Sequence, residues 1–240
     1  MKTSERHRLK ENELSHALSG ATARLNENKR EFGLVLAIVA LVLIAGGGYW
    51  AWKTRTETRA QVMLSDAIAI VQAPVEEAKA GAKPGVRTYP TIRARAEAAL
   101  AKFTEVFTAY PSTKAGIAAR YNAAAALAML GKPAEAATRY QEVVDRAGTD
   151  DFYGRMAQLG IVEASAQAKE YEKAISAAQA LVDNAGEEVI PRDALLIELG
   201  RVQAAAGKKA EAKQTLDKVI AEFPDSAYIE EAKQLLASLT

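Results

Sequence analysis

Hydrophobic and polar positions divide this chain of 240 residues into two parts. The first part ends with an uncharged run of 21 residues from Phe32 to Trp52. As a helix rising about 1.5 Å per residue, the run spans roughly 30 Å, the thickness of the hydrocarbon core of a bilayer. It closes with Tyr49, Trp50 and Trp52, and such aromatic side chains gather at membrane interfaces. The pattern therefore predicts one transmembrane helix over residues 32–52.

The charges that flank this run predict its orientation. The apolar run does not fit a cleaved signal peptide, because such a peptide has a short leader and an apolar stretch of only roughly 7–15 residues. Residues 1–31 hold seven Lys/Arg, whereas residues 53–67 hold three. The positive-inside rule then places residues 1–31 in the cytoplasm as a tail. Residues 53–240 would lie outside it, which in a bacterium means a single-pass protein of the cytoplasmic (inner) membrane with a periplasmic domain.

The second part, residues 53–240, has the periodicity of an all-α domain. It is rich in Ala, Leu, Glu and Lys, and its apolar residues recur at helical spacing. Turn residues interrupt this pattern at regular intervals and predict helix breaks. Ser112, Asp150 and Asp225 are predicted to cap the helices that follow them. The predicted breaks lie at 81–90, 110–111, 131–133, 148–151, 168–169, 184–189, 207–208 and 223–224.

An internal repeat runs through this domain. Ala99, Ala136, Ala174 and Ala212 open similar apolar patterns and are separated by 37, 38 and 38 residues. A fixed period of this size predicts stacked helical hairpins, because no hairpin can bury its apolar face alone.

The repeats over residues 91–240 resemble tetratricopeptide repeats, whose usual period is about 34 residues. The resemblance implies that small residues stand where the two helices of a hairpin cross. Residues 54–80 fit the first helix of an opening pair that continues from the membrane helix. The departures are the longer period and Lys169 in place of a turn glycine. The small crossing positions are Ala124, Val162 and Gly200 in the first helices and Ala136, Ala174 and Ala212 in the second helices.

The whole layout is similar to the ancillary subunit family of the SecYEG translocon. A short charged tail, one membrane helix and a tetratricopeptide-like outer domain carry this likeness. It implies the Sec translocon, periplasmic chaperones and their clients as partners. The closing stretch from Phe223 also resembles the repeats of periplasmic cell-division coordinators of the Tol-Pal system. A scaffold for cell division or envelope synthesis therefore stays open as the alternative.

Composition argues against catalysis and against nucleic acid. Residues 53–240 carry 24 Lys/Arg and 25 Asp/Glu, so their balance of −1 offers no reason to expect nucleic acid. His7 and His16 both precede the apolar run, and the chain has no cysteine. Imidazole or thiol catalysis and the usual zinc sites are thereby excluded from the large domain. We expect no enzyme activity, catalytic residue, metal, cofactor or small-molecule substrate.

The resemblance implies that partners bind a groove lined by the first helix of each pair. Its inward positions are mostly small and apolar, and a Glu163–Arg201 ion pair is predicted among them. Such a groove would suit apolar segments of varied sequence, with little dependence on salt. The rival is recognition by the basic stretch formed by Lys83, Arg87, Arg93, Arg95 and Lys102. The predicted groove residues are Tyr121, Met129, Met156, Leu159, Glu163, Ile197 and Arg201.

The prediction for the whole chain is a single transmembrane helix followed by an α-solenoid of tetratricopeptide-like hairpins. Its function would be that of a membrane-anchored scaffold for protein–protein interactions. The most specific form of this function is chaperone-like assistance to envelope protein translocation or folding at the outer face of the cytoplasmic membrane.

Overall fold

Helices make up most of the computed structural model, which describes residues 29–76, 87–184 and 190–239 and their side chains from Gly33 onward. These ranges hold nine helices and, apart from a single bridge between Val75 and Tyr89, no β-structure. The predicted all-α class is confirmed. The helices are α2 (Lys29–Gln72), α3 (Ile92–Ala109), α4 (Lys114–Met129), α5 (Pro133–Ala147), α6 (Phe152–Gln167), α7 (Tyr171–Asp183), α8 (Arg192–Ala205), α9 (Lys209–Glu222) and α10 (Ile229–Ser238).

Each predicted break that the structure describes falls between two helices. The predicted breaks at 81–90 and 184–189 lie partly outside the described residues, as does nearly all of the predicted tail at 1–31. Contacts divide the chain into two units, Met1–Arg55 and Thr56–Thr240.

Helix α2 begins with the apolar run and ends inside the second unit. Its segment from Gly33 is long and apolar enough to cross a membrane, judged by length and composition alone. Ala60, Leu64, Ala67 and Ile70 follow at spacings of three or four residues and are buried against α3 and α4. The predicted opening helix over 54–80 is therefore present, and it ends at Gln72.

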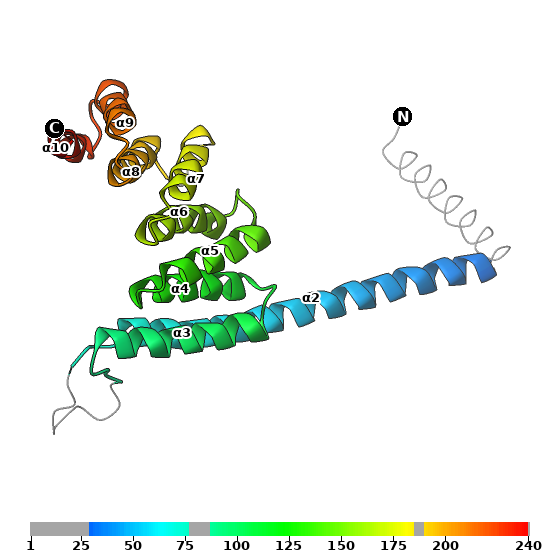
Figure 1. The fold of residues 1–240 in the computed structure, drawn as a ribbon. Helices are drawn as coiled ribbons and strands as arrows, with labels where there is room; N and C mark the ends of the chain where they lie inside the picture. The colour runs from blue at the N-terminus through cyan, green and yellow to red at the C-terminus, as the bar shows by residue number, and fades with distance from the viewer. Residues whose placement is uncertain (1–28, 77–86, 185–189, 240) are drawn as a thin grey trace, which may run out of the picture. The chain divides into compact units, whose positions relative to one another are not determined.

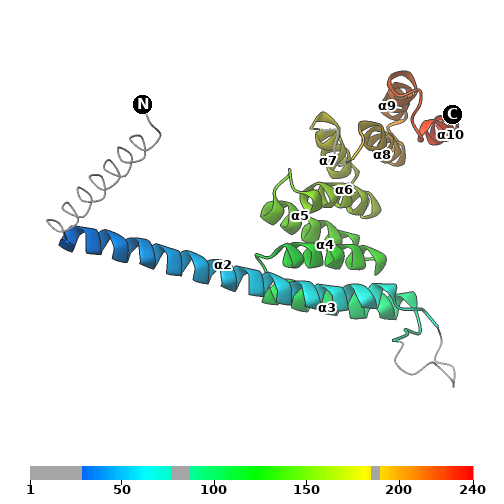
Figure 2. The same cartoon turned by 180° about the vertical axis from the view of Figure 1, so that it is seen from behind.

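In the second unit the helices stack as hairpins in chain order, with the second half of α2 alongside α3 (Figures 1 and 2). The pairs α4–α5, α6–α7 and α8–α9 are the three repeats, and α10 packs against α9 and α8. Three hydrophobic clusters run along the stack, the first in α2–α4, the second in α4–α6 and the third in α6–α10. Tyr153 packs against both the first and the second cluster, so neighbouring cores are joined.

The predicted helix caps are wrong by one residue or more. Thr113, rather than Ser112, accepts the N–H of Gly116 at the start of α4. Asp151, rather than Asp150, accepts the N–H of Tyr153 at the start of α6. The capping residue must have an extended backbone just before the first helical residue, and Thr113 and Asp151 occupy that position.

The start of α10 has no side-chain cap, because its N-cap residue is Tyr228; a serine turn precedes it. The hydroxyl of Ser226, and not the carboxylate of Asp225, accepts the N–H of Tyr228. Ser226 in turn donates to Asp193 Oδ2 at 2.5 Å, which ties the start of α10 to the start of α8.

Candidate functional site

The crossing of the two helices in each pair sets which side chains face outward. The predicted small residues Ala124, Val162, Ala136, Ala174 and Ala212 are fully buried, which confirms their place at the crossings. Gly200 also lies at a close helix crossing, because a Cβ there would lie 2.8 Å from Leu216 Cδ2 on the neighbouring α9.

The predicted groove residues differ in exposure: three are exposed, three are half-buried, and Ile197 is buried. Met129, Glu163 and Arg201 are exposed. Tyr121, Met156 and Leu159 are half-buried. Met129 lines a small apolar hollow of about 60 Å³ together with Val71 of α2 and Phe103 of α3.

Ile197 is a correction to the predicted set. Its side chain is 2% exposed and belongs to the core cluster of α6–α10. The core cluster that holds it draws its residues from α6 to α10, so Ile197 supplies stability rather than a contact surface. The next residue, Glu198, is partly exposed.

An aromatic cluster joins α4, α5 and α6. The ring of Tyr121 lies 5.4 Å from that of Tyr140 and 5.7 Å from that of Tyr153. Phe152, which is 57% exposed, stands edge-on to Tyr153 at 5.3 Å. The ring of Tyr140 is held over Gly160, where a Cβ would lie 2.6 Å from it. These separations are those of favourable aromatic pairs.

The charge of Glu163 affects two tyrosines of this aromatic cluster. Burial raises the pKa of Tyr121, and the negative charge of Glu163 raises it further. The pKa of Tyr140 is raised by burial, then by Tyr121 and Glu163. Both hydroxyls therefore stay protonated at neutral pH, as neutral donors near an anionic carboxylate.

A network of charges lies at α8 and α10. Arg201 forms ion pairs with Glu198 at 2.5 Å and with Glu231 of α10, whereas Glu163, its predicted partner in a charge pair, acts on it only as a nearby charge. Glu198 is one helical turn before Arg201, and α10 brings Glu231 to the same guanidinium. Burial raises the pKa of Glu198, Arg201 opposes this shift, and the charges of Glu163 and Glu231 add to it.

A second charged cluster, among α3, α4 and α5, is structural. Arg120 is 6% exposed, and its Cζ lies 4.3 Å from the centre of the Phe107 ring. Arg139 lies over the same ring at 5.1 Å, and both guanidinium groups donate to Glu142. Burial lowers the pKa of Arg120, and Glu142 offsets much of this effect. These side chains serve one another rather than a ligand.

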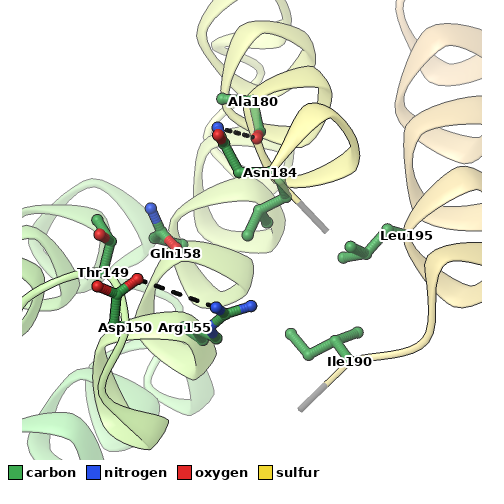
Figure 3. Close-up of a pocket in the computed structure, with 9 residues that line it drawn as sticks. Thr149, Asp150, Arg155, Gln158, Ala180, Asn184, Ile190 and Leu195 are labelled. Carbon is green, nitrogen blue, oxygen red and sulfur yellow. Dashed lines mark hydrogen bonds and ion pairs between the residues drawn. The ribbon is translucent and has the colours of Figure 1, made fainter. Parts of the chain in front are cut away.

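A pocket of about 290 Å³ lies between the start of α6, the end of α7 and the start of α8 (Figure 3). Arg155 points toward Asp150, with 3.9 Å between the closest nitrogen and oxygen. Its volume is at the low end for small-molecule sites, and it holds no aromatic side chain of the kind that anchors protein partners. Among the described residues, no three His, Cys, Asp or Glu side chains gather as a metal site.

Two of the four cations that the structure describes in the predicted basic stretch have acidic partners, and Arg87 is exposed. Arg93 pairs with Glu97 at 3.0 Å, and Lys102 pairs with Glu105 at 2.8 Å. Arg95 donates to the backbone oxygen of Ala73 at 3.0 Å. Lys83 lies outside the described residues.

We define the A-face as the surface that the first helices α4, α6 and α8 share. Sequence reasoning identified Tyr121, Met156, Leu159, Glu163 and Arg201 on it, but missed the other rings and carboxylates that accompany them. The period of 38 residues gave no signal for Glu198, because it aligns Glu198 with Asn122 and with the buried Gly160. The A-face residues are Tyr121, Phe152, Tyr153, Met156, Leu159, Glu163, Glu198 and Arg201, with Tyr140 beneath and Glu231 beside them.

Comparison with known proteins agrees with this architecture. The family model of the tetratricopeptide repeat matches residues 118–148 and 194–226, which span α4–α5 and α8–α9. The pair between them, α6–α7, lies outside the matched residues, and its turn carries the departure Lys169 in place of a glycine. Neither the curated proteins nor the solved structures give a match. The chain thus contains tetratricopeptide repeats, an architecture that typically serves as a scaffold for protein–protein interactions.

Proposed function

We propose that this protein is a membrane-anchored, non-enzymatic scaffold that holds protein partners beside the cytoplasmic membrane. Residues 53–240 would lie at the outer face of that membrane, and the A-face would contact the partner. In its most specific form, the proposal is that the protein assists translocation or folding of envelope proteins, with the Sec translocon and periplasmic chaperones or clients as partners.

The anchor is supported by the exposure of the apolar run. Every side chain from Gly33 to Trp50 is exposed, including Leu41, Leu43, Ile44 and Trp50 at 69%, 69%, 76% and 70%. A contiguous apolar surface of this extent is unfavourable in water, and burial in the hydrocarbon core of a bilayer would remove it from water.

The observation that carries the proposal is the continuity of α2. One helix contains both the apolar run and the buried positions Ala60, Leu64, Ala67 and Ile70 of the repeat domain. The same helix that would anchor the chain is therefore the first packed helix of the stack. An interaction domain built in this way keeps its partners next to the membrane.

Site-specific photo-crosslinking in native membranes tests this function. A photoreactive residue at Gln167, exposed on α6 one turn after Glu163 and so on the A-face side of that helix, should give adducts with membrane or exported proteins. The same residue at Lys213, exposed on α9, is the matched control and should give few. Adducts with the translocon or its clients support the specific form, whereas adducts with division or envelope-synthesis proteins favour the alternative scaffold. Equal adducts from both positions, or none from Gln167, would contradict binding through the A-face.

A further inference from the structure

The pocket between the start of α6, the end of α7 and the start of α8 holds a cation without a close partner. The side chain of Arg155 is 25% exposed, and its Nε is buried with no hydrogen-bond partner among the described residues. Its ion pair with Asp150 is loose, at 3.9 Å, and the side chain of Asp150 is 98% exposed. Figure 3 shows the guanidinium extending from α6 into the open space of the pocket. Because buried donors are normally paired, this guanidinium has hydrogen-bonding capacity for a ligand.

The rest of the lining combines an apolar floor with one free amide. Leu181 and Leu195 are buried and Ile190 is half-buried, and all three line the pocket. The half-buried Gln158 also lines it, and its amide forms no hydrogen bond with any residue that the structure describes. Apolar walls with a few polar groups are the usual composition of a binding site.

A single guanidinium of this kind selects for a carboxylate. Its planar fork of N–H groups matches the two oxygens of a carboxylate, and the amide of Gln158 can donate to the same group. One guanidinium balances one negative charge, whereas a phosphate group carries nearly two. Asp150 does not block the site, because an ion pair this long and this exposed contributes little.

The pocket adjoins the A-face along α6. Arg155 and Gln158 directly precede Met156 and Leu159 of the A-face, and successive residues of a helix lie about 100° apart. The pocket therefore opens on the side of α6 that neighbours the A-face.

We propose that this pocket binds a carboxylate that the partner protein carries on a short apolar stem, as a glutamate side chain does. The carboxylate lies against the guanidinium of Arg155 and the amide of Gln158, and the stem lies on Leu181, Leu195 and Ile190. This inference rests on the proposed function and specifies one chemical group of the partner. Because the pocket holds no aromatic side chain, its contribution is to select among partner segments more than to supply affinity.

Methyl NMR of the full chain in zwitterionic nanodiscs tests the inference. The methyl groups of Leu181 and Leu195 report on the pocket, and those of Leu64 in the α2–α4 cluster are the internal control. The first probe is N-acetylglutamate α-methylamide, and the second is its glutamine counterpart, which keeps the shape and removes the charge. The third probe, N-acetylalanine, presents a chain-terminal carboxylate instead.

We expect the glutamate probe to shift the Leu181 and Leu195 signals saturably, with a dissociation constant on the order of 1 mM. The glutamine probe should bind about tenfold more weakly, because it lacks the charge-assisted hydrogen bonds. The Leu64 signals should not move with either probe.

Arg155→Gln should lower the affinity for the glutamate probe about tenfold, to that of the glutamine probe. Arg146→Gln removes an exposed arginine on α5, outside the pocket, and is the matched control with no change expected. Asp150→Asn should raise the affinity about two- to threefold, because it removes the carboxylate that competes for Arg155. This last variant keeps Arg155, so the inference stays testable even if Arg155→Gln unfolds the domain.

Equal affinity for the glutamate and glutamine probes, or an unchanged affinity in Arg155→Gln, would overturn this inference. The absence of a saturable shift with both carboxylate probes would overturn it too. Tighter binding of N-acetylalanine than of the glutamate probe would support a carboxylate site and assign its source to the end of a partner chain. In each case the crosslinking experiment at Gln167 still reports on the scaffold function, so the two failures are distinguishable.

Discussion

At the scale of single residues, three turns show how strictly the repeat constrains the backbone. Gly131, Lys169 and Gly207 have φ angles of 74°, 62° and 77°, all in the left-handed region. In each turn the next N–H bonds back to the first helix, to Leu127, Ser165 and Gln203 at 2.9–3.0 Å. The absence of glycine at Lys169 therefore leaves the turn unchanged and places a lysine in a strained conformation.

Replacing Lys169 by glycine should stabilise the protein. The left-handed conformation costs a non-glycine residue about 1–2 kcal/mol, part of which glycine loses again through its freer unfolded chain. We expect a net gain of about 1 kcal/mol, or a melting temperature about 2–4 °C higher by circular dichroism. Gly207→Lys is the matched reverse change and should lower the melting temperature. A lower melting temperature for Lys169→Gly would contradict strain at this turn.

The fully buried alanines of the second helices should resist enlargement. Ala174 and Ala212 are 0% exposed at close helix crossings, so Ala174→Leu and Ala212→Leu add volume where none is free. Such overpacking costs about 1–3 kcal/mol. Thermal unfolding should show a lower midpoint for both variants, while Lys173→Ala on the exposed side of α7 should leave it close to the parent. Leucine variants that melt like the parent would show that the assigned crossings are wrong.

At the scale of elements, α2 determines how the stack begins. The two carboxylate oxygens of Glu57 accept the N–H groups of Lys114 and Ala115, each at 3.0 Å. Glu57 thus caps the first turn of α4 from a helix 57 residues earlier in the chain. A negative charge at this position also opposes the positive end of the α4 dipole.

Glu57→Ala should loosen the start of α4. Loss of the two charge-assisted hydrogen bonds removes the acceptors of the N–H groups of the exposed Lys114 and the buried Ala115, and we expect a cost of about 1–2 kcal/mol. Hydrogen exchange of the Lys114 and Ala115 amides should accelerate, and the melting midpoint should fall. Glu57→Gln keeps one acceptor oxygen and should be intermediate, while Asp66→Ala, at an exposed position of α2, should change neither. Unchanged exchange in Glu57→Ala would refute the cap.

At the scale of the whole molecule, the proposed orientation across the membrane can be measured directly. The chain has no cysteine, so a single cysteine introduced by Ser4→Cys or Ser238→Cys reports its own location. The excess of Lys/Arg before the apolar run predicts that a membrane-impermeant thiol reagent labels the Ser238→Cys variant in intact cells. Labelling of the Ser4→Cys variant alone would reverse the orientation.

The repeating and local features of this protein could be predicted from its sequence. The apolar run, the turns at Gly131, Lys169 and Gly207, and the small residues at the helix crossings each depend on a short pattern or on a fixed period. Patterns of this kind can be interpreted without knowing which distant residues come into contact, because helix spacing and turn geometry are set within a few residues. The opening helix was foreseen for the same reason.

Tertiary structure decided what the surface of the stack presents. Ile197 is buried in a core that five helices, α6 to α10, build together, and Arg201 pairs with Glu231 because α10 brings that carboxylate to it. The aromatic cluster likewise draws its rings from three helices. Helical periodicity assigns a residue to a side of its own helix, but the partner of a long side chain depends on helices that arrive from elsewhere in the chain. The electrostatic character of the A-face, with Glu163 left unpaired among the described residues, is a consequence of that packing.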